Sequence, residues 1–85
     1  MSSTPRKVRT LDVRPLIAQG EEPLASIMAT VRAVAPGESF VLISPFLPSP
    51  LIERLQSEGF TARPEHRSDG GWQTQFTRPA APDAR

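Results

Sequence analysis

Prolines and glycines cut this chain into short segments, and they limit what it can fold into. Ten of the 85 residues are proline and five are glycine. Residues 44–50 hold three of these prolines and therefore cannot lie inside a helix or a sheet. Pro15 interrupts the chain in the same way, as do Pro36 and Gly37. The stretches between these breaks are long enough only for single helices or strands, which predicts one small domain.

Four of the segments have the pattern of β-strands and two have the pattern of α-helices. Strands are indicated by alternation of apolar and polar residues, or by a short apolar run between turn residues. The predicted strands are residues 8–14, 39–44, 60–67 and 72–78. The predicted helices, where apolar residues recur at helical spacing, are residues 23–35 and 49–57. Residues 15–20 are expected to be a loop.

Residues that favour helix ends and turns stand between these segments. Pro23 and Pro50 suit a first helical turn, because a missing N–H costs nothing there. Ser49 is expected to be the N-cap of the second helix, and Gly59 is expected to end that helix at its C′ position. The sequence Ser-Asp-Gly-Gly at residues 68–71 predicts a hairpin between the last two strands.

The order of elements is β-α-β-α-β-β, which predicts an α/β (α+β) two-layer sandwich. A four-stranded mixed sheet with two helices on one face would satisfy the packing of so small a domain. The domain is expected to span residues 8–78, with disordered tails at residues 1–7, which are basic, and 79–85. The other face of the sheet should be polar, apart from an apolar seam contributed by residues 40–43.

The charge and the composition exclude several classes of protein. Ten basic and nine acidic residues give a net charge of +1, which does not indicate nucleic acid or an anionic membrane as a partner. The chain has no cysteine, which excludes disulfides, thiolate nucleophiles and cysteine-bound zinc. No apolar stretch approaches the ~20 residues of a membrane span, and the first residues do not resemble a signal peptide. We therefore expect a cytoplasmic protein.

His66 is the sole histidine and the first residue to consider for a metal site. Such a site would need His66 to meet carboxylates such as Asp12 and Glu22 from across the fold. One histidine with carboxylates is a poor set of ligands for a transition metal. The interpretation we favour is an edge-strand histidine with one hydrogen bond, so no metal and no cofactor is expected.

Two pairs of charged residues flank the first predicted loop. Asp12 and Arg14 either hold a ligand at this loop or form a surface ion pair that fixes its geometry, and we favour the ion pair. Glu21 and Glu22 precede the first predicted helix, where negative charge compensates the helix dipole. Capping explains both carboxylates without acid–base chemistry, so we expect no enzymatic activity.

The aromatic residues leave two further questions open. Trp72 and Phe76 alternate on one face of the last strand and are most simply part of the core. On the open face they would instead form a stacking platform for single-stranded RNA. Phe46 and Leu47 lie between prolines, and this dipeptide either tucks over the end of the sheet or stands exposed as a contact point.

Taken in order, these turn and core motifs resemble a known family, the domain of unknown function family 2249, whose small proteins have a TusA/SirA-like fold. The matching residues are Leu11–Arg14, Pro23, Gly37 with Glu38, Ser44–Phe46, Pro48, Pro50 with Leu51, Gly59 with Phe60, and Trp72. The resemblance implies the two-layer fold and a cytoplasmic bacterial setting, with haemerythrin-like, nitrogen-oxide or redox proteins as neighbours. Gly20 stands where sulfur carriers have their reactive cysteine, so sulfur relay is excluded. The fold is also similar to the C-terminal domain of bacterial initiation factor three.

These observations predict a non-catalytic binding or adaptor module that is a monomer or a weak dimer. Its expected partner is another protein, with a haemerythrin-like or redox protein as the candidate. The loops at residues 12–23 and 45–50 both follow strands, so both lie near helix starts and can be neighbours. The candidate partner surface consists of Asp12, Arg14, Glu21, Glu22, Pro23, Phe46, Leu47 and Pro48. The alternatives are a ligand- or metal-responsive module using Asp12, Glu22 and His66, and an RNA-binding domain, which would need a basic open sheet face.

Overall fold

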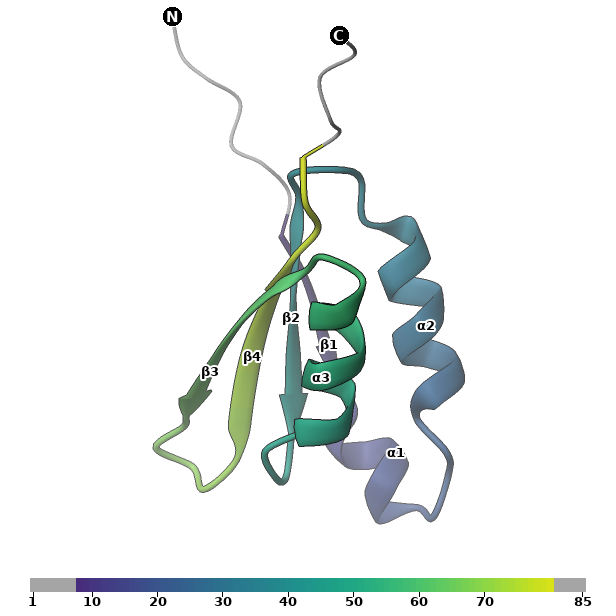
Figure 1. Cartoon of the computed structure of the whole chain (residues 1–85). Coiled ribbons are helices and arrows are strands. Elements are labelled where there is room, and N and C mark those ends of the chain that lie inside the picture. Colours follow the sequence, from purple (N-terminus) through teal and green to yellow (C-terminus); the bar gives the residue numbers. More distant parts are fainter. Residues whose placement is uncertain (1–7, 81–85) are drawn as a thin grey trace, which may run out of the picture.

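The computed structural model describes residues 8–80, which form four strands and three helices (Figure 1). In chain order these are β1 (Val8–Asp12), α1 (Arg14–Ala18), α2 (Leu24–Ala33), β2 (Ser39–Ser44), α3 (Ser49–Ser57), β3 (Thr61–His66) and β4 (Trp72–Thr77). The two-layer α/β class is confirmed, with one additional helix between the first strand and the first predicted helix. The tails expected at residues 1–7 and 81–85 lie outside the described residues. None of the helices described is long and apolar enough to cross a bilayer.

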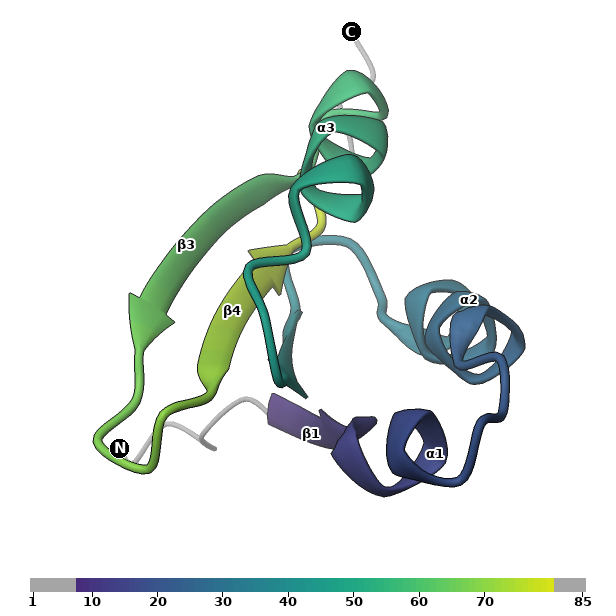
Figure 2. The same ribbon diagram turned by 90° about the horizontal axis from the view of Figure 1, so that it is seen from below.

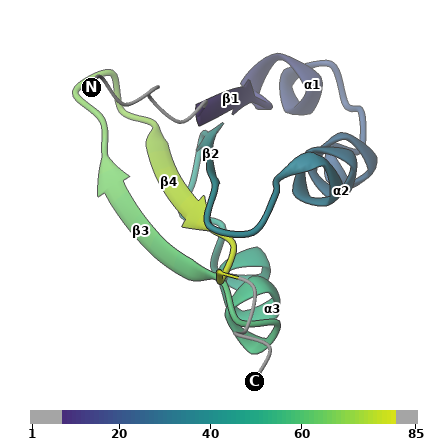
Figure 3. The same cartoon turned by 90° about the horizontal axis from the view of Figure 1, so that it is seen from above.

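The four strands form one mixed sheet in the order β1-β2-β4-β3. β1 runs parallel to β2, and β4 runs antiparallel to both β2 and β3. All three helices lie on one face of this sheet, with α3 and α2 well separated on it (Figures 2 and 3). The sheet therefore has one covered face and one open face, and the covered face has β2 at its centre.

The segment expected to be a loop contains the short helix α1. Pro15 lies in its first turn, where no N–H partner is needed. The N–H of Ile17 donates to the carbonyl of Val13 over 3.0 Å, which begins the helical hydrogen bonding. Ile17 packs against the core, so burial of apolar area stabilises a helix of only five residues. The expectation of a loop here is wrong.

The two longer helices begin at prolines, but not with the caps expected from the sequence. The Pro23 carbonyl accepts from the N–H of Ile27, and the Pro48 carbonyl accepts from the N–H of Ile52. These bonds make Pro23 and Pro48 the N-cap residues, so Ser49 is the first residue of α3 and its expected role as N-cap is wrong. No side chain caps either helix.

The end of α3 does follow the prediction. Gly59 has a φ of 98°, a conformation that favours glycine, and the N–H of Phe60 donates to the carbonyl of Leu55 over 3.0 Å. A Cβ at Gly59 would lie 3.1 Å from Pro79, so this part of the predicted C-terminal tail packs against the turn after α3.

The core lies between the covered face and the helices, and Phe40 and Phe76 form its centre. Both rings are fully buried, and they stack with 5.2 Å between centroids. Trp72 shares their face but is only half-buried, contrary to the expectation that it belongs to the core. It is the first residue of β4, at the end of the sheet, and its ring meets the exposed His66 ring edge-on at 5.1 Å.

One buried side-chain polar group in the described part of the chain has no hydrogen-bond partner. This is the hydroxyl of Thr74, a fully buried residue of β4. Replacing Thr74 with valine keeps the shape and removes the unpaired hydroxyl, so Thr74→Val should raise the free energy of unfolding by about 1 kcal/mol. Urea denaturation measures this change.

Thr77→Val is the matched control for this variant. The Thr77 hydroxyl is 2.7 Å from that of Ser39, so its removal leaves a part-buried partner unpaired and should destabilise the fold. Equal losses of stability in the two variants would contradict the account of Thr74.

Candidate functional site

A groove of about 580 Å³ opens on the covered face of the sheet between α2 and α3. Val13, Leu42 and Ser44 line its floor. One wall comes from α1, α2 and the segment that joins them, and the other comes from α3 and the loop before it. Figures 2 and 3 show α1 and α2 standing apart from α3 on this face of the sheet. The groove exists because β2 is central in the sheet while the helices that flank it stand apart.

The structure brings together the two loops that the sequence marked as a candidate surface. Glu21, Glu22 and Pro23 line one wall of the groove, and Phe46 and Pro48 line the other. The remaining three members of the predicted surface do not line the groove. Leu47 is outside the lining, and Asp12 and Arg14 belong to a separate ion-pair network at the end of the sheet.

The rim of the groove carries exposed apolar side chains. Phe46 is 54% exposed and Leu24 is 40% exposed, and Leu47, beside Phe46, is 38% exposed. Of the two alternatives for the dipeptide between the prolines, the exposed one is observed. The Ser44 hydroxyl donates to the Phe46 carbonyl over 2.7 Å and holds this loop against the end of β2. Prolines on both sides limit the loop further, so Phe46 is presented at low entropic cost.

Three charged side chains line the groove. Arg54, on α3, is paired with Glu58 at 3.8 Å. Glu21 and Glu22 are exposed, and no described side chain forms an ion pair with either. Both directly precede Pro23, the N-cap of α2, and neither side chain makes a capping hydrogen bond to this helix. Their charges therefore stand at the groove without a capping bond or an ion pair among the described residues.

Asp12 and Arg14 form the ion pair favoured from the sequence, and it is part of a larger network. The Arg14 guanidinium donates to both Asp12 oxygens at 3.0 and 2.9 Å, and to Asp69 at 2.9 Å. Arg67 donates to Asp69 at 3.1 Å and to Gln73 at 2.9 Å. The network therefore ties the end of β1 to the β3–β4 hairpin across the end of the sheet.

The part of this network on the β3–β4 hairpin, formed by Arg67, Asp69 and Gln73, was not predicted from the sequence. Asp69 stood out only as a turn residue, yet its carboxylate accepts from the N–H of Gly71 at 3.0 Å as well as from Arg14. A Cβ at Gly71 would lie 3.2 Å from the guanidinium of Arg14, so this glycine allows the arginine to approach. Arg14 and Asp69 are 55 residues apart, and no local pattern links them.

The network lowers the pKa values of its carboxyl groups. The Gly71 N–H, followed by Arg14, holds the pKa of Asp69 well below its ordinary value of 3.8. Hydrogen bonds from the Arg14 side chain likewise lower the pKa of Asp12. Ionised Asp69 thus stabilises the fold above pH 3.8, and this contribution is lost as the pH falls through 3.8 toward the folded-state pKa.

Asp69→Asn is therefore expected to be less stable than wild type at neutral pH, with a difference that shrinks as the pH drops below about 4. Urea denaturation between pH 7 and pH 2 measures this convergence. Glu65→Gln removes an exposed carboxylate that no described side chain pairs with, and its difference from wild type should stay small throughout. A constant gap for Asp69→Asn would contradict the role assigned to the network.

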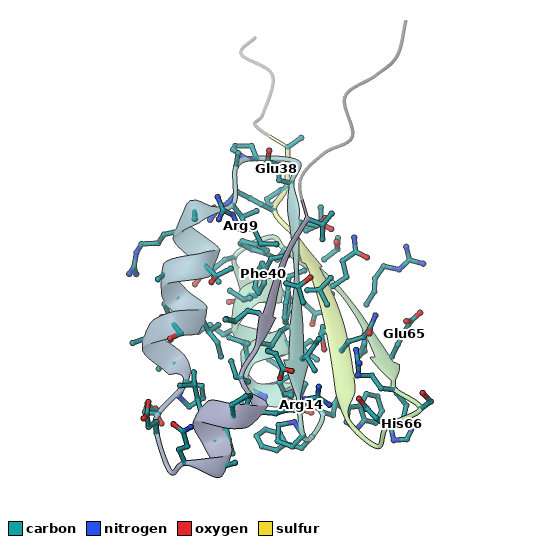
Figure 4. The ribbon with its side chains drawn as sticks, turned by 180° about the vertical axis from the view of Figure 1, so that it is seen from behind. Arg9, Arg14, Glu38, Phe40, Glu65 and His66 are labelled. Carbon is teal, nitrogen blue, oxygen red and sulfur yellow. The ribbon has the colours of Figure 1, made fainter. Side chains whose placement is uncertain are left out.

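The structure does not gather the candidate metal ligands. Asp12 is held by Arg14, Glu22 lies at the groove, and His66 is at the far edge of the sheet against Trp72. Figure 4 shows Arg14 near the end of β1 and His66 near the end of β3. Among residues 8–80 no group of three histidine or acidic side chains could hold a metal ion.

The RNA-binding alternative required a basic open face of the sheet, and the observed open face is not basic. Its outer strand β3 presents Arg63 and Glu65 there, and β1 presents Asp12. On β4, Gln73 and Gln75 lie on the same open face, whereas Trp72 and Phe76 alternate with them and lie on the covered face. The open face therefore has neither the aromatic platform nor the positive charge of a single-strand binding surface.

The fold and its surface define a small two-layer α/β domain with an open apolar groove between two helices. The chain belongs to the family described as uncharacterized conserved protein (DUF2249), whose family model matches residues 10–78. This match covers nearly all of the described residues and confirms the family resemblance drawn from the turn and core motifs. No curated protein and no solved structure matches the chain.

Proposed function

We propose that this domain is a non-catalytic adaptor that binds a segment of a partner protein in the groove between α2 and α3. The observation that carries the proposal is the position of the exposed apolar side chains. Leu24 and Phe46 line the groove and Leu47 adjoins it, while Val8 is the one other large apolar residue exposed among those described. Exposed apolar side chains gathered at one site are typical of an interaction surface.

The chemistry of the groove supports binding rather than catalysis. Neither histidine nor cysteine lines it, and Ser44 supplies the hydroxyl at its floor. That hydroxyl donates to the Phe46 carbonyl and not to a base that could activate it as a nucleophile. A role as a sulfur carrier is no part of this proposal, because a sulfur carrier requires the cysteine that this chain lacks. A redox or haemerythrin-like partner and a cytoplasmic location remain parts of this proposal.

Photo-cross-linking from the groove tests the proposal. p-Benzoylphenylalanine is placed at Phe46 in one variant and at Val8 in another, since both side chains are about half exposed. We expect position 46 to cross-link to one protein segment, identified by mass spectrometry, and position 8 not to reach that segment. Adding Leu24→Ser, a change at the groove rim, should abolish the cross-link from position 46. Cross-links that survive Leu24→Ser, or that form equally from position 8, would overturn the proposal.

A further inference from the structure

We propose that the occupant of the groove is an amphipathic helix of the partner protein, with lysine or arginine along the flank that faces Glu21 and Glu22. This inference rests on the proposed function and specifies the kind of segment that binds. It follows from what the walls of the groove offer to a guest: hydrogen-bonding groups, shape and charge.

The groove offers few hydrogen bonds to an extended segment. Three residues of its lining are proline and have no N–H. The N–H groups of Gly20 and Glu21 already donate to carbonyls of α1, and the Ser44 hydroxyl donates to Phe46. An extended guest would bury backbone groups without partners, whereas a helix satisfies its own. The groove therefore favours a helix, which inserts only its side chains.

The shape of the groove fits this mode of binding. Its floor is apolar, with Val13 at the end of β1 and Leu42 on β2, and its walls present Ile27 from α2 and Leu51 from α3. A guest helix with apolar side chains at i, i+3 or i+4, and i+7 places one continuous stripe toward such a floor. Phe46 at the rim would then cover one edge of the stripe.

The charge of the groove determines which charge is favoured on the flank of the bound helix. Glu21 and Glu22 stand on the α1–α2 wall without ion-pair partners, and Arg54 on the opposite wall is paired with Glu58. The unpaired charge at the groove is therefore negative and lies on one side. A cation on the matching flank of the guest is favoured, and an acidic flank is repelled.

Three synthetic peptides test the inference against the full chain. The first is an amphipathic helix of about 18 residues, long enough to be helical, with a leucine stripe and lysine flanks. The second replaces the lysines with glutamates, and the third keeps the lysines but has two central prolines that prevent a helix. Amide NMR titration follows Leu24, Ile27 and Leu51, and fluorescence anisotropy gives the affinities. Glu21→Gln with Glu22→Gln is the test variant, and Glu53→Gln with Glu65→Gln is the charge-matched control outside the groove lining.

We expect the lysine peptide to shift the groove amides and the glutamate peptide to bind at least about tenfold more weakly. The double variant at Glu21 and Glu22 should weaken the lysine peptide about five- to tenfold, and the control variant should not. Equal affinities for the first two peptides would overturn the basic flank, and equal binding of the proline peptide would overturn the helix. Either result leaves the groove as the docking site. If no peptide shifts the groove amides, the inference fails, and cross-linking from Phe46 decides the proposed function independently.

Discussion

Replacing Phe76 with alanine is expected to lower the free energy of unfolding by about 3–5 kcal/mol. The ring is fully buried, stacks on Phe40 at the centre of the sheet, and belongs to the cluster that joins the sheet to the helices. Its removal loses the apolar burial and leaves a cavity that the closely packed neighbours cannot fill. Urea denaturation followed by circular dichroism measures the loss.

Trp72→Ala is the informative comparison, because Trp72 is the larger ring on the same strand and face. It is half-buried and outside the core cluster, so its loss should cost only about 1–2 kcal/mol. A domain of this size has roughly 4–13 kcal/mol of stability, and Phe76→Ala could leave too little folded protein. Phe76→Leu, with an expected cost of about 1–2 kcal/mol, keeps the test decisive. A loss for Trp72→Ala as large as that for Phe76→Ala would contradict this description of the core.

Replacing Arg78 with glutamine is expected to cost about 2–3 kcal/mol, through the end of α2 rather than through the last strand. The Arg78 guanidinium donates to the carbonyls of Val31 and Val34 at 2.6 and 2.7 Å. Val31 lies in the last turn of α2, where its carbonyl otherwise accepts only the N–H of Val34 at 3.3 Å, and Val34 is the C-cap residue. The guanidinium also lies over the Phe60 ring, 4.9 Å from its centroid, so one side chain links α2 to the turn after α3.

Two variants separate this role from a simple loss of charge. Arg63→Gln removes an exposed arginine that no described side chain pairs with, and it should change the stability by less than about 0.5 kcal/mol. Arg78→Lys keeps the charge but lacks the planar group that donates to both carbonyls, and it should recover only a minor part of the loss. Full recovery by lysine would show that charge alone acts at this position.

Alternation of apolar and polar residues, or a short apolar run between turn residues, predicted the four strands, and apolar residues at helical spacing predicted the two longer helices. The helix α1 has five residues, too few for a helical period to show. The cap of α3 was assigned to the wrong residue, because the carbonyl of Pro48, and not that of Ser49, accepts the first helical hydrogen bond.

The candidate site was predictable to the extent that it depends on topology. Loops that follow neighbouring parallel strands meet at one end of a sheet, so the approach of Glu22 and Phe46 followed from the order of elements. The contacts of Asp69 and Arg78 did not follow from the order of elements, because each contact joins residues more than 40 positions apart through a single side chain. The exposure of Trp72 depends on which part of the covered face the helices reach, and a strand pattern does not contain this information.

We propose that the domain binds its partner through the groove, and not through a metal ion or the open face of the sheet. An amide NMR titration of the full chain with zinc, a nucleotide, a short single-stranded RNA and the lysine-flanked helical peptide tests this claim in one experiment. We expect amide shifts only when the peptide is added, and we expect them to cluster at residues 20–27 and 44–54. Shifts at Asp12, Glu22 and His66 on adding zinc, or along Arg63 and the open face on adding RNA, would contradict it.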